Sequence, residues 1–167
     1  KDIVQIIHGT TLATNALIER RGAKTALITT EGFREVIEMR TESRCEQYDL
    51  NLTLPEPLLP RQMRFTVPGR VDAQSKVLVD LHRADVEAVV DRIAEGGFAS
   101  VAVGLIHSYL NPAHEELVRD VLLERLPDVT VSISSEVSPQ MREYERFNTV
   151  VANAYIKPLM ASYLGRL

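Results

Sequence analysis

Residues 100–107, which read SVAVGLIH, decide the fold class of this chain. The stretch is apolar without the alternation of a half-exposed strand, as expected for a central strand that is covered on both faces. Longer stretches with helical spacing lie on either side of it in the sequence. We therefore predict an α/β domain, with a mixed sheet and flanking helices.

Helices are predicted directly before and after this strand. Residues 83–95 carry apolar side chains at the spacing of one buried helical stripe, namely Val86, Val89, Val90 and Ile93. After the strand, Asn111 and Pro112 indicate a helix start. An Asn side chain accepts from the unpaired N–H groups of a first turn, and Pro gives up an N–H that has no partner there.

More distant elements follow from the same patterns. Strands are predicted at residues 3–7, 23–30 and 129–134, and helices at residues 11–20 and from about residue 147, where Pro158 should bend the helix. Residues 41–70 differ, because they show no sustained period and contain Pro55, Pro57, Pro60 and Pro68. We interpret them as an ordered surface excursion or a lid rather than a core layer, and a plain connection is equally open.

Composition excludes several classes of protein. The chain has 167 residues, 45% of them hydrophobic, which suits one domain and makes two full domains improbable. A net charge of −4 and a pI of about 5.6 argue against a nucleic-acid partner. No apolar run approaches the roughly 20 residues that cross a bilayer. The lone Cys45 forms no internal disulfide and fits a reducing compartment, so we interpret the protein as cytoplasmic.

Both ends of the sequence suggest that it is part of a longer protein. The chain opens at Lys1 directly into an apolar stretch, and an amphipathic pattern is still running at Leu167. We therefore expect an excerpt.

The first candidate site is the junction of a strand with a helix. His8, Gly9, Thr10 and Thr11 lie at this junction, and Asn15 follows in the first helical turn. Small residues and unpaired N–H groups at a helix start favour a phosphate or a carboxylate. The alternative is that Thr10 or Thr11 only caps the helix and that His8 is structural.

The second candidate site follows the last predicted strand. Glu136, Arg142, Glu143 and Arg146 lie between this strand and the final helix. Ligand-binding groups gather at the carboxyl ends of strands in open α/β sheets, so these side chains are candidates for a cleft. The alternative is a surface loop whose Glu and Arg side chains pair with one another, which needs no function.

Other motifs are missing or weak. The four histidines show no metal-ligand spacing, so we predict no metal site, and His107 is expected to cap a turn. The common fingerprints GxSxG, GxGxxG and GxxxxGK[ST] do not occur. The residues alone therefore name no reaction.

Four blocks of sequence, in this order, carry a resemblance to a known family. They are HGTTLATNALIERRGAKTALITTEGFREVIEMR, YDL, SVAVGLIHSYLNPAHE and SSEVSPQMREYERFNTVVANAYIKP. The chain resembles the N-terminal region of the hydantoinase A/oxoprolinase family. This family includes N-methylhydantoinases, 5-oxoprolinases and subunits of acetone and acetophenone carboxylases, and its fold is similar to the actin/sugar kinase/Hsp70-like (ribonuclease H-like) class.

The resemblance implies what the chain lacks. Family members usually begin with a phosphate loop of the form DxGGTxTD, which this sequence does not contain, and the rest of the ATP cleft belongs to a following ATPase domain. Residues 1–167 are thus expected to be one N-terminal domain fragment, inactive alone. The family also implies ATP and Mg²⁺ in the full-length protein, and a hydantoinase B-type partner subunit or domain.

The resemblance also implies roles for the candidate residues. Residues 8–15 are expected near the nucleotide cleft, and Arg142 and Arg146 are the candidate cations for a transferred phosphoryl group. Arg44, Tyr48 and Asp49 are expected in a substrate-facing lid.

The function that we predict is ATP-dependent opening of a hydantoin, N-methylhydantoin or 5-oxoproline ring. Phosphorylation of the amide oxygen creates a good leaving group, so that water opens the ring. The alternatives are a subunit of an ATP-dependent ketone carboxylase and a non-enzymatic actin-like interaction module.

Overall fold

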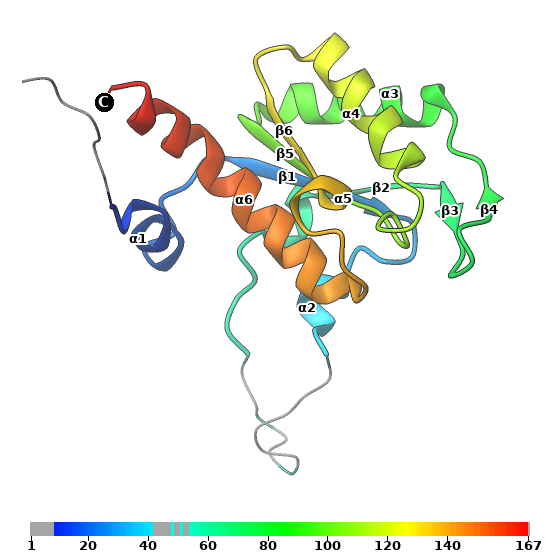
Figure 1. Ribbon diagram of the computed structural model, residues 1–167, viewed down its shortest axis with the longest axis horizontal. Coiled ribbons are helices and arrows are strands. Elements are labelled where there is room, and N and C mark those ends of the chain that lie inside the picture. Colours follow the sequence, from blue (N-terminus) through cyan, green and yellow to red (C-terminus); the bar gives the residue numbers. More distant parts are fainter. Residues whose placement is uncertain (1–8, 42–47, 49–50, 52–53, 167) are drawn as a thin grey trace, which may run out of the picture.

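The computed structural model describes residues 9–41, 48, 51 and 54–166. Its centre is a four-stranded sheet in the order β2-β1-β5-β6. All neighbouring strands of this sheet run parallel (Figure 1). The strands are β1 (Thr25–Thr30), β2 (Arg64–Val67), β5 (Ser100–Gly104) and β6 (Thr130–Ile133).

Helices cover both faces of this sheet. In Figure 1, α3 and α4 lie on one face and the long α6 crosses the other. The helices are α1 (Leu12–Ile18), α2 (Val36–Met39), α3 (Arg83–Gly96), α4 (Ala113–Arg125), α5 (Ser134–Val137) and α6 (Glu143–Leu164). A 3₁₀ turn, η1 (Arg61–Met63), precedes β2, and a separate antiparallel hairpin joins β3 (Arg70–Val71) to β4 (Val77–Val79).

Two apolar cores result from the alternation of side chains along the strands. Ala26 and Ile28 of β1 face the core beneath α3 and α4, whereas Leu27 between them faces α6. In β5, Val101 and Val103 alternate in the same way with Ala102. Each central strand is therefore buried on both faces, and the polar residues in it are small hydroxyl residues, Thr in β1 and Ser in β5.

The α6 core depends on a close approach at Gly104. A Cβ atom at this position would lie 2.6 Å from the Phe147 ring, closer than carbon atoms pack. Gly104 thus lets the fully buried ring of Phe147 rest on the end of β5. Burial of a Phe side chain contributes about 1.5–3 kcal/mol, so this contact helps to hold α6 on the sheet.

Helix α6 continues through Pro158, which has no N–H to donate to the carbonyl of Ala154 one turn earlier. Ser100 Oγ donates to this carbonyl at 2.8 Å. Ser100 Oγ also lies 3.0 Å from the carbonyl of Thr130, so its one hydrogen is shared between an acceptor in α6 and an acceptor in β6. The bend predicted at Pro158 stays a prediction.

Several predicted elements are confirmed. The strand predicted at residues 100–107 is β5, which ends three residues earlier, at Gly104, and the helix predicted at residues 83–95 is α3. The predicted helix start is also confirmed, because Asn111 Oδ1 accepts from the backbone N–H of Ala113 at 3.2 Å. The α/β class with flanking helices is confirmed as well. Antiparallel pairing, among the strands that the structure describes, occurs only in the β3–β4 hairpin.

Two predictions need correction. Residues 41–70 are not all outside the core, since β2 pairs with β1 and buries Phe65 and Val67. Helix α6 begins at Glu143, four residues before the predicted start, because the charged turn ahead of Phe147 is already helical. The strand predicted at residues 3–7 lies outside the described residues.

No helix within residues 9–41 and 54–166 has the length and apolar character that a bilayer crossing needs.

Candidate functional site at the carboxyl edge of the sheet

The topology of the sheet points to one place for a site. The chain passes from β1 to β2 on one side and from β5 to β6 on the other, so the strand order reverses between β1 and β5. In open α/β sheets, ligands bind outside the carboxyl ends of the strands at such a reversal. Here the two strand ends are joined, because the backbone N–H of Ile106 donates to Thr30 Oγ1 at 3.0 Å.

A small pocket opens beside this reversal. Its volume is about 30 Å³, room for one or two water molecules. Two segments form its wall, the turn that follows β5 and the start of α6. The lining residues are Ile106, His107, Tyr109, Met141, Arg142, Glu143 and Arg146. Three of the predicted site residues, Arg142, Glu143 and Arg146, therefore come together here.

Arg146 forms the inner wall of the pocket and is only 2% exposed. Its Nη2 donates to the carbonyl of Leu105 at 2.8 Å, its Nη1 to the carbonyl of Gln140 at 2.9 Å and its Nε to Ser134 Oγ at 3.1 Å. These bonds use three of the five guanidinium N–H donors. Burial lowers the pKa of Arg146, but an arginine side chain stays charged at physiological pH.

Glu115 is a buried negative charge that acts on this arginine. Its side chain, on the first turn of α4, is 0% exposed. Glu115 Oε1 accepts from the N–H of Leu105 at 2.8 Å and from Ser134 Oγ at 2.7 Å, and Oε2 accepts from the N–H of Ser135 at 2.8 Å. The carboxylate therefore ties together the ends of β5 and β6.

Ser134 joins the two buried charges. A carboxylate only accepts, so the single hydroxyl hydrogen of Ser134 goes to Glu115. Its lone pairs then accept from Arg146 Nε and from Ser108 Oγ, which lies 3.1 Å away. The orientation of every hydroxyl in this network is thereby fixed.

Arg142 and Glu143 lie at the open side of the pocket. Both are exposed, and the Arg142 side chain has no polar partner within the described part of the chain. Glu143 and Glu145 occupy the first turn of α6, where the helix dipole favours acidic groups. The opening thus presents an exposed cation beside an exposed carboxylate, whose charge also acts on Arg146.

Two residues at the pocket have left-handed backbones, which is uncommon outside glycine. The φ angles are 57° for His107 and 80° for Arg142. The carbonyl of His107 accepts from the N–H groups of Leu110 and Asn111, so its backbone closes the turn after β5. The prediction that His107 caps this turn is confirmed for its backbone, while its ring lines the pocket.

Glu136 does not join this group. Its carboxylate, 62% exposed, accepts from Arg119 Nη1 at 2.7 Å. The alternative prediction, in which the Glu and Arg side chains of one surface loop pair with one another, is therefore wrong. Glu136 pairs with α4, and Arg146 is buried.

The first candidate site lies elsewhere. Thr10 Oγ1 accepts from the N–H of Leu12 at 3.1 Å, which is the capping role of the alternative prediction. Gly9, Thr11 and Asn15 are exposed, and His8 lies outside the described residues. Figure 1 shows α1 beside the later part of α6, far from its start. The N–H of Ala23, just after α1, donates to the carbonyl of Tyr155, which lies about 18 Å along α6 from Glu143.

The predicted lid is described only in part. Tyr48 is 94% exposed, and Arg44 and Asp49 lie outside the described residues. Residues 54–60, which lead back to the sheet, are fixed by arginines that donate to their carbonyls. Arg20 donates to Glu56 and Pro57, and Arg40 donates to Pro55.

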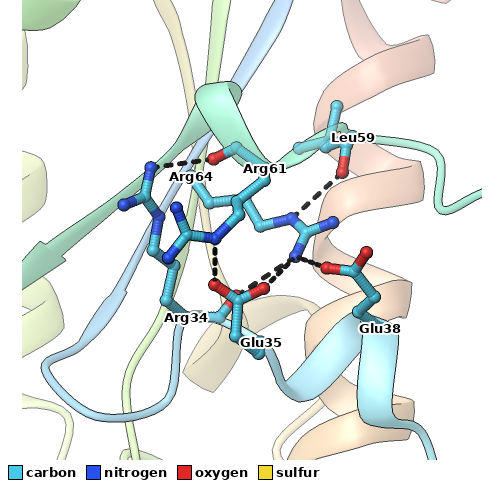
Figure 2. A network of polar contacts seen from close by, with 6 residues as sticks. All are labelled: Arg34, Glu35, Glu38, Leu59, Arg61 and Arg64. Atoms are coloured by element: carbon cyan, nitrogen blue, oxygen red, sulfur yellow. Dashed lines mark hydrogen bonds and ion pairs between the residues drawn. The ribbon is translucent and has the colours of Figure 1, made fainter.

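Arg64 organises the end of this returning segment, as Figure 2 shows. Its side chain is 1% exposed, and Nε donates to the carbonyl of Leu59 at 3.1 Å. Nη1 donates to Glu35 Oε2 at 3.0 Å and to Glu38 Oε2 at 2.8 Å. The Arg64 guanidinium holds the pKa of the Glu38 carboxyl below its usual value. Arg61 adds a second bond to Glu35 at 2.6 Å.

The site predicted from the sequence did not include Glu115. A signal for Glu115 existed, because it precedes Val118 and Leu122 by three and seven residues and so lies on the buried stripe of α4. A charged residue on such a stripe indicates a buried polar network. No group of three or more His, Cys, Asp or Glu side chains suited to a metal occurs among the residues that the structure describes.

The sheet topology and the polar side chains at its carboxyl edge put the chain among the open α/β domains. A family model described as the hydantoinase/oxoprolinase N-terminal region matches residues 1–126. The chain therefore belongs to this family, as its sequence blocks predicted.

Several curated proteins are similar to this chain. Caprolactamase subunit alpha of Pseudomonas jessenii is 36% identical over 96% of the chain, and acetophenone carboxylase gamma subunit of Aromatoleum aromaticum is 30% identical over 98%. 5-Oxoprolinase of Saccharomyces cerevisiae is 28% identical over 95%. The chain spans 23%, 24% and 14% of these relatives, respectively.

The fold is also that of a solved relative. The crystal structure of the ATP-dependent caprolactamase from Pseudomonas jessenii matches with a TM-score of 0.87 over 95% of this chain and 23% of its own. Two of the relatives are named as subunits of larger enzymes.

Proposed function

We propose that this chain is an N-terminal region of an ATP-dependent enzyme that opens a cyclic amide. The observation that carries the proposal is the likeness to caprolactamase, 36% identical over 95% of the chain at a TM-score of 0.87. The substrates that we expect are hydantoin, N-methylhydantoin and 5-oxoproline, and caprolactam joins them through this relative. We also propose that the enzyme acts in the cytoplasm.

Two residues of the pocket suit ATP and Mg²⁺. The exposed guanidinium of Arg142 has no polar partner within the described residues and suits a phosphate group. Glu143 beside it offers carboxylate oxygens, the ligands that Mg²⁺ takes. ATP, when bound, supplies the phosphoryl group that turns the amide oxygen into a leaving group.

The pocket itself supports a shared site rather than a complete one. A volume of about 30 Å³ is too small for a nucleotide. We propose that the remaining walls, the phosphate loop and the second ATPase domain come from other parts of the full-length protein, and that residues 1–167 alone are inactive. We also propose that the full-length protein has the actin-like fold that the family resemblance implies.

We also propose roles for the other predicted site residues, which would act at positions away from Arg142. His8, Gly9, Thr10, Thr11 and Asn15 would meet the nucleotide at a different part of the cleft from Arg142, since Ala23, just after α1, binds α6 near Tyr155. Arg44, Tyr48 and Asp49 would face the substrate, and Glu136 would lie at the rim.

The test uses the full-length protein, co-expressed with its hydantoinase B-type partner. Ring opening and ADP release are measured with each cyclic amide, ATP and Mg²⁺. We expect turnover with at least one substrate and a large loss of turnover in Arg142→Ala. The absence of ring opening and of ADP release with all of them would overturn the proposal.

A second candidate is a ketone carboxylase subunit, which the similarity to acetophenone carboxylase gamma subunit favours. Bicarbonate-dependent ATP hydrolysis with acetophenone or acetone would identify it, because an amide hydrolase has no use for bicarbonate. A non-enzymatic interaction module would show neither activity.

A further inference from the structure

The proposed function leaves the buried carboxylate of Glu115 without a role. An ionised group costs several kcal/mol to bury unless hydrogen bonds repay the lost hydration. Here three donors converge on the carboxylate, two of them backbone N–H groups of residues that follow β5 and β6. Such a set of donors is built to hold a charge in one place.

The carboxylate occupies the point where the two strands separate. Pairing between β5 and β6 ends at Val103 and Ile133. Two residues further along each strand, the N–H groups of Leu105 and Ser135 donate to opposite oxygens of Glu115. The Glu115 side chain thus takes the place of the next pair of hydrogen bonds between the strands. It also fixes the direction in which the backbone continues after β5.

The same carboxylate reaches the start of α6 through two links. Ser134 passes its hydrogen to Glu115 and accepts from Arg146. Arg146 in turn holds the carbonyls of Leu105 and Gln140. Leu105 is therefore fixed at both its N–H and its carbonyl, and Gln140 lies two residues before Arg142.

We propose that Glu115 is a positioning residue, whose buried carboxylate sets the place of Arg142 and Glu143 at the pocket. The inference rests on the proposed function for the meaning of this pocket. The hydrogen bonds of Glu115 go to Leu105, Ser134 and Ser135, which do not line the pocket, although its charge acts on Arg146. It acts through Ser134 and Arg146 and through the turn after β5.

The test compares Glu115→Gln with Glu116→Gln in the full-length protein with its partner. Both substitutions remove one negative charge from neighbouring positions of α4, but Glu116 is exposed. A Gln amide has one oxygen, so its NH₂ group faces an N–H donor and loses at least one bond. The assay is run well below the melting temperature of the variant. We expect Glu115→Gln to raise the KM for ATP about tenfold or more. Glu116→Gln should leave this KM unchanged.

A purely structural role would give a different result. It would lower kcat in proportion to the unfolded fraction and leave the KM for ATP unchanged, which would overturn the proposal. If Glu115→Gln fails to fold, Ser134→Ala decides, because it cuts the link to Arg146 and keeps both backbone donors on the carboxylate. We expect it to raise the same KM, and an unchanged KM would overturn the proposal.

Hydrogen exchange gives a readout that does not depend on activity. Glu115→Gln should speed exchange at residues 106–110 and 141–145 and leave residues 86–93 of α3 unchanged. Unchanged exchange at residues 141–145 would overturn the positioning role even in an active enzyme. Faster exchange there, in a protein that turns over no cyclic amide, would support positioning and refute only the proposed function.

Discussion

Gly104 has the smallest side chain in the α6 core and one of the tightest surroundings. Its replacement by Ala would place a Cβ 2.6 Å from the Phe147 ring and force the helix or the strand to move. Overpacking of this kind costs about 1–3 kcal/mol. We expect Gly104→Ala to lower the free energy of unfolding by this amount in urea titrations. Gly9→Ala, which meets no atom within 4 Å, is the control and should change little.

Arg64 and Arg61 form a matched pair of arginines on one glutamate. Arg64 is buried and Arg61 is 63% exposed, although both bond to Glu35. Removal of a buried partner leaves acceptors unpaired, whereas an exposed ion pair contributes at most about 1 kcal/mol. We expect Arg64→Ala to cost about 1–3 kcal/mol of unfolding free energy, because the partner carboxylates are themselves 35% and 51% exposed. The expectation fails if Arg61→Ala costs as much.

His114 makes stability depend on pH. Burial lowers its pKa, against the opposing charge of Asp80, so the native state binds this proton less readily than the unfolded state does. Its contribution to stability is present above the unfolded pKa of about 6.5 and is lost as the pH falls toward the lower native pKa. Unfolding free energies measured between pH 7.5 and pH 5 should fall more steeply in the wild type than in His114→Gln. Equal slopes would contradict this assignment.

Single residues were also where prediction from sequence reached its limit. Arg142 and Glu143 were predicted at a cleft and line the pocket. Arg146 was predicted with them, but its burial depends on the carbonyl of Leu105, 41 residues earlier in the chain. Local patterns cannot report a partner at that distance. The burial of Glu115 could have been predicted from its place on the stripe of α4, but its donors could not, because they follow two different strands.

At the scale of elements, a hydrogen bond from Ser100 of β5 to the carbonyl of Ala154 in α6 helps the helix to accommodate Pro158. Ser100→Ala would remove the side-chain donor from the carbonyls of Ala154 and Thr130, at a cost of about 1–3 kcal/mol. Pro158→Ala would restore the helical N–H for the carbonyl of Ala154. We therefore expect the double variant to lose less stability than the sum of the single variants. A double-mutant cycle in denaturant measures this, and simple additivity would refute the coupling.

Elements with a complete local pattern were predictable, and elements defined by distant pairing were not. Helix α3 repeats its apolar stripe over 14 residues, and β5 is buried throughout, with Val101, Ala102 and Val103 at its centre. Strand β2 has only four residues, follows a proline-rich stretch and begins with an arginine, so it resembled a loop. Its burial comes from pairing with β1. The start of α6 was not predicted, because the charged residues Glu143 and Glu145 are typical of a surface loop. Only the burial of Arg146 in the structure shows that this turn packs against the sheet.

At the scale of the whole molecule, the two central strands should be the most protected part of the sheet. Strands β1 and β5 pair with neighbours on both sides and carry helices over both faces. Amides exchange most slowly where opening requires global unfolding. Exchange measured by mass spectrometry should therefore be slowest at residues 26–29 and 101–104. Equally slow exchange in the β3–β4 hairpin would contradict this ranking.

The order of the strands has a consequence for synthesis on the ribosome. Leu27 in β1 needs the helix that begins at Glu143 to cover it. At roughly 5–20 residues per second, that helix follows β1 after roughly 6–23 s. During this interval the nascent chain carries an uncovered apolar strand face that invites wrong pairing. We expect the core between the sheet and α6 to form late in synthesis. Until then, we expect this face of the sheet to depend on chaperones that shield the growing chain.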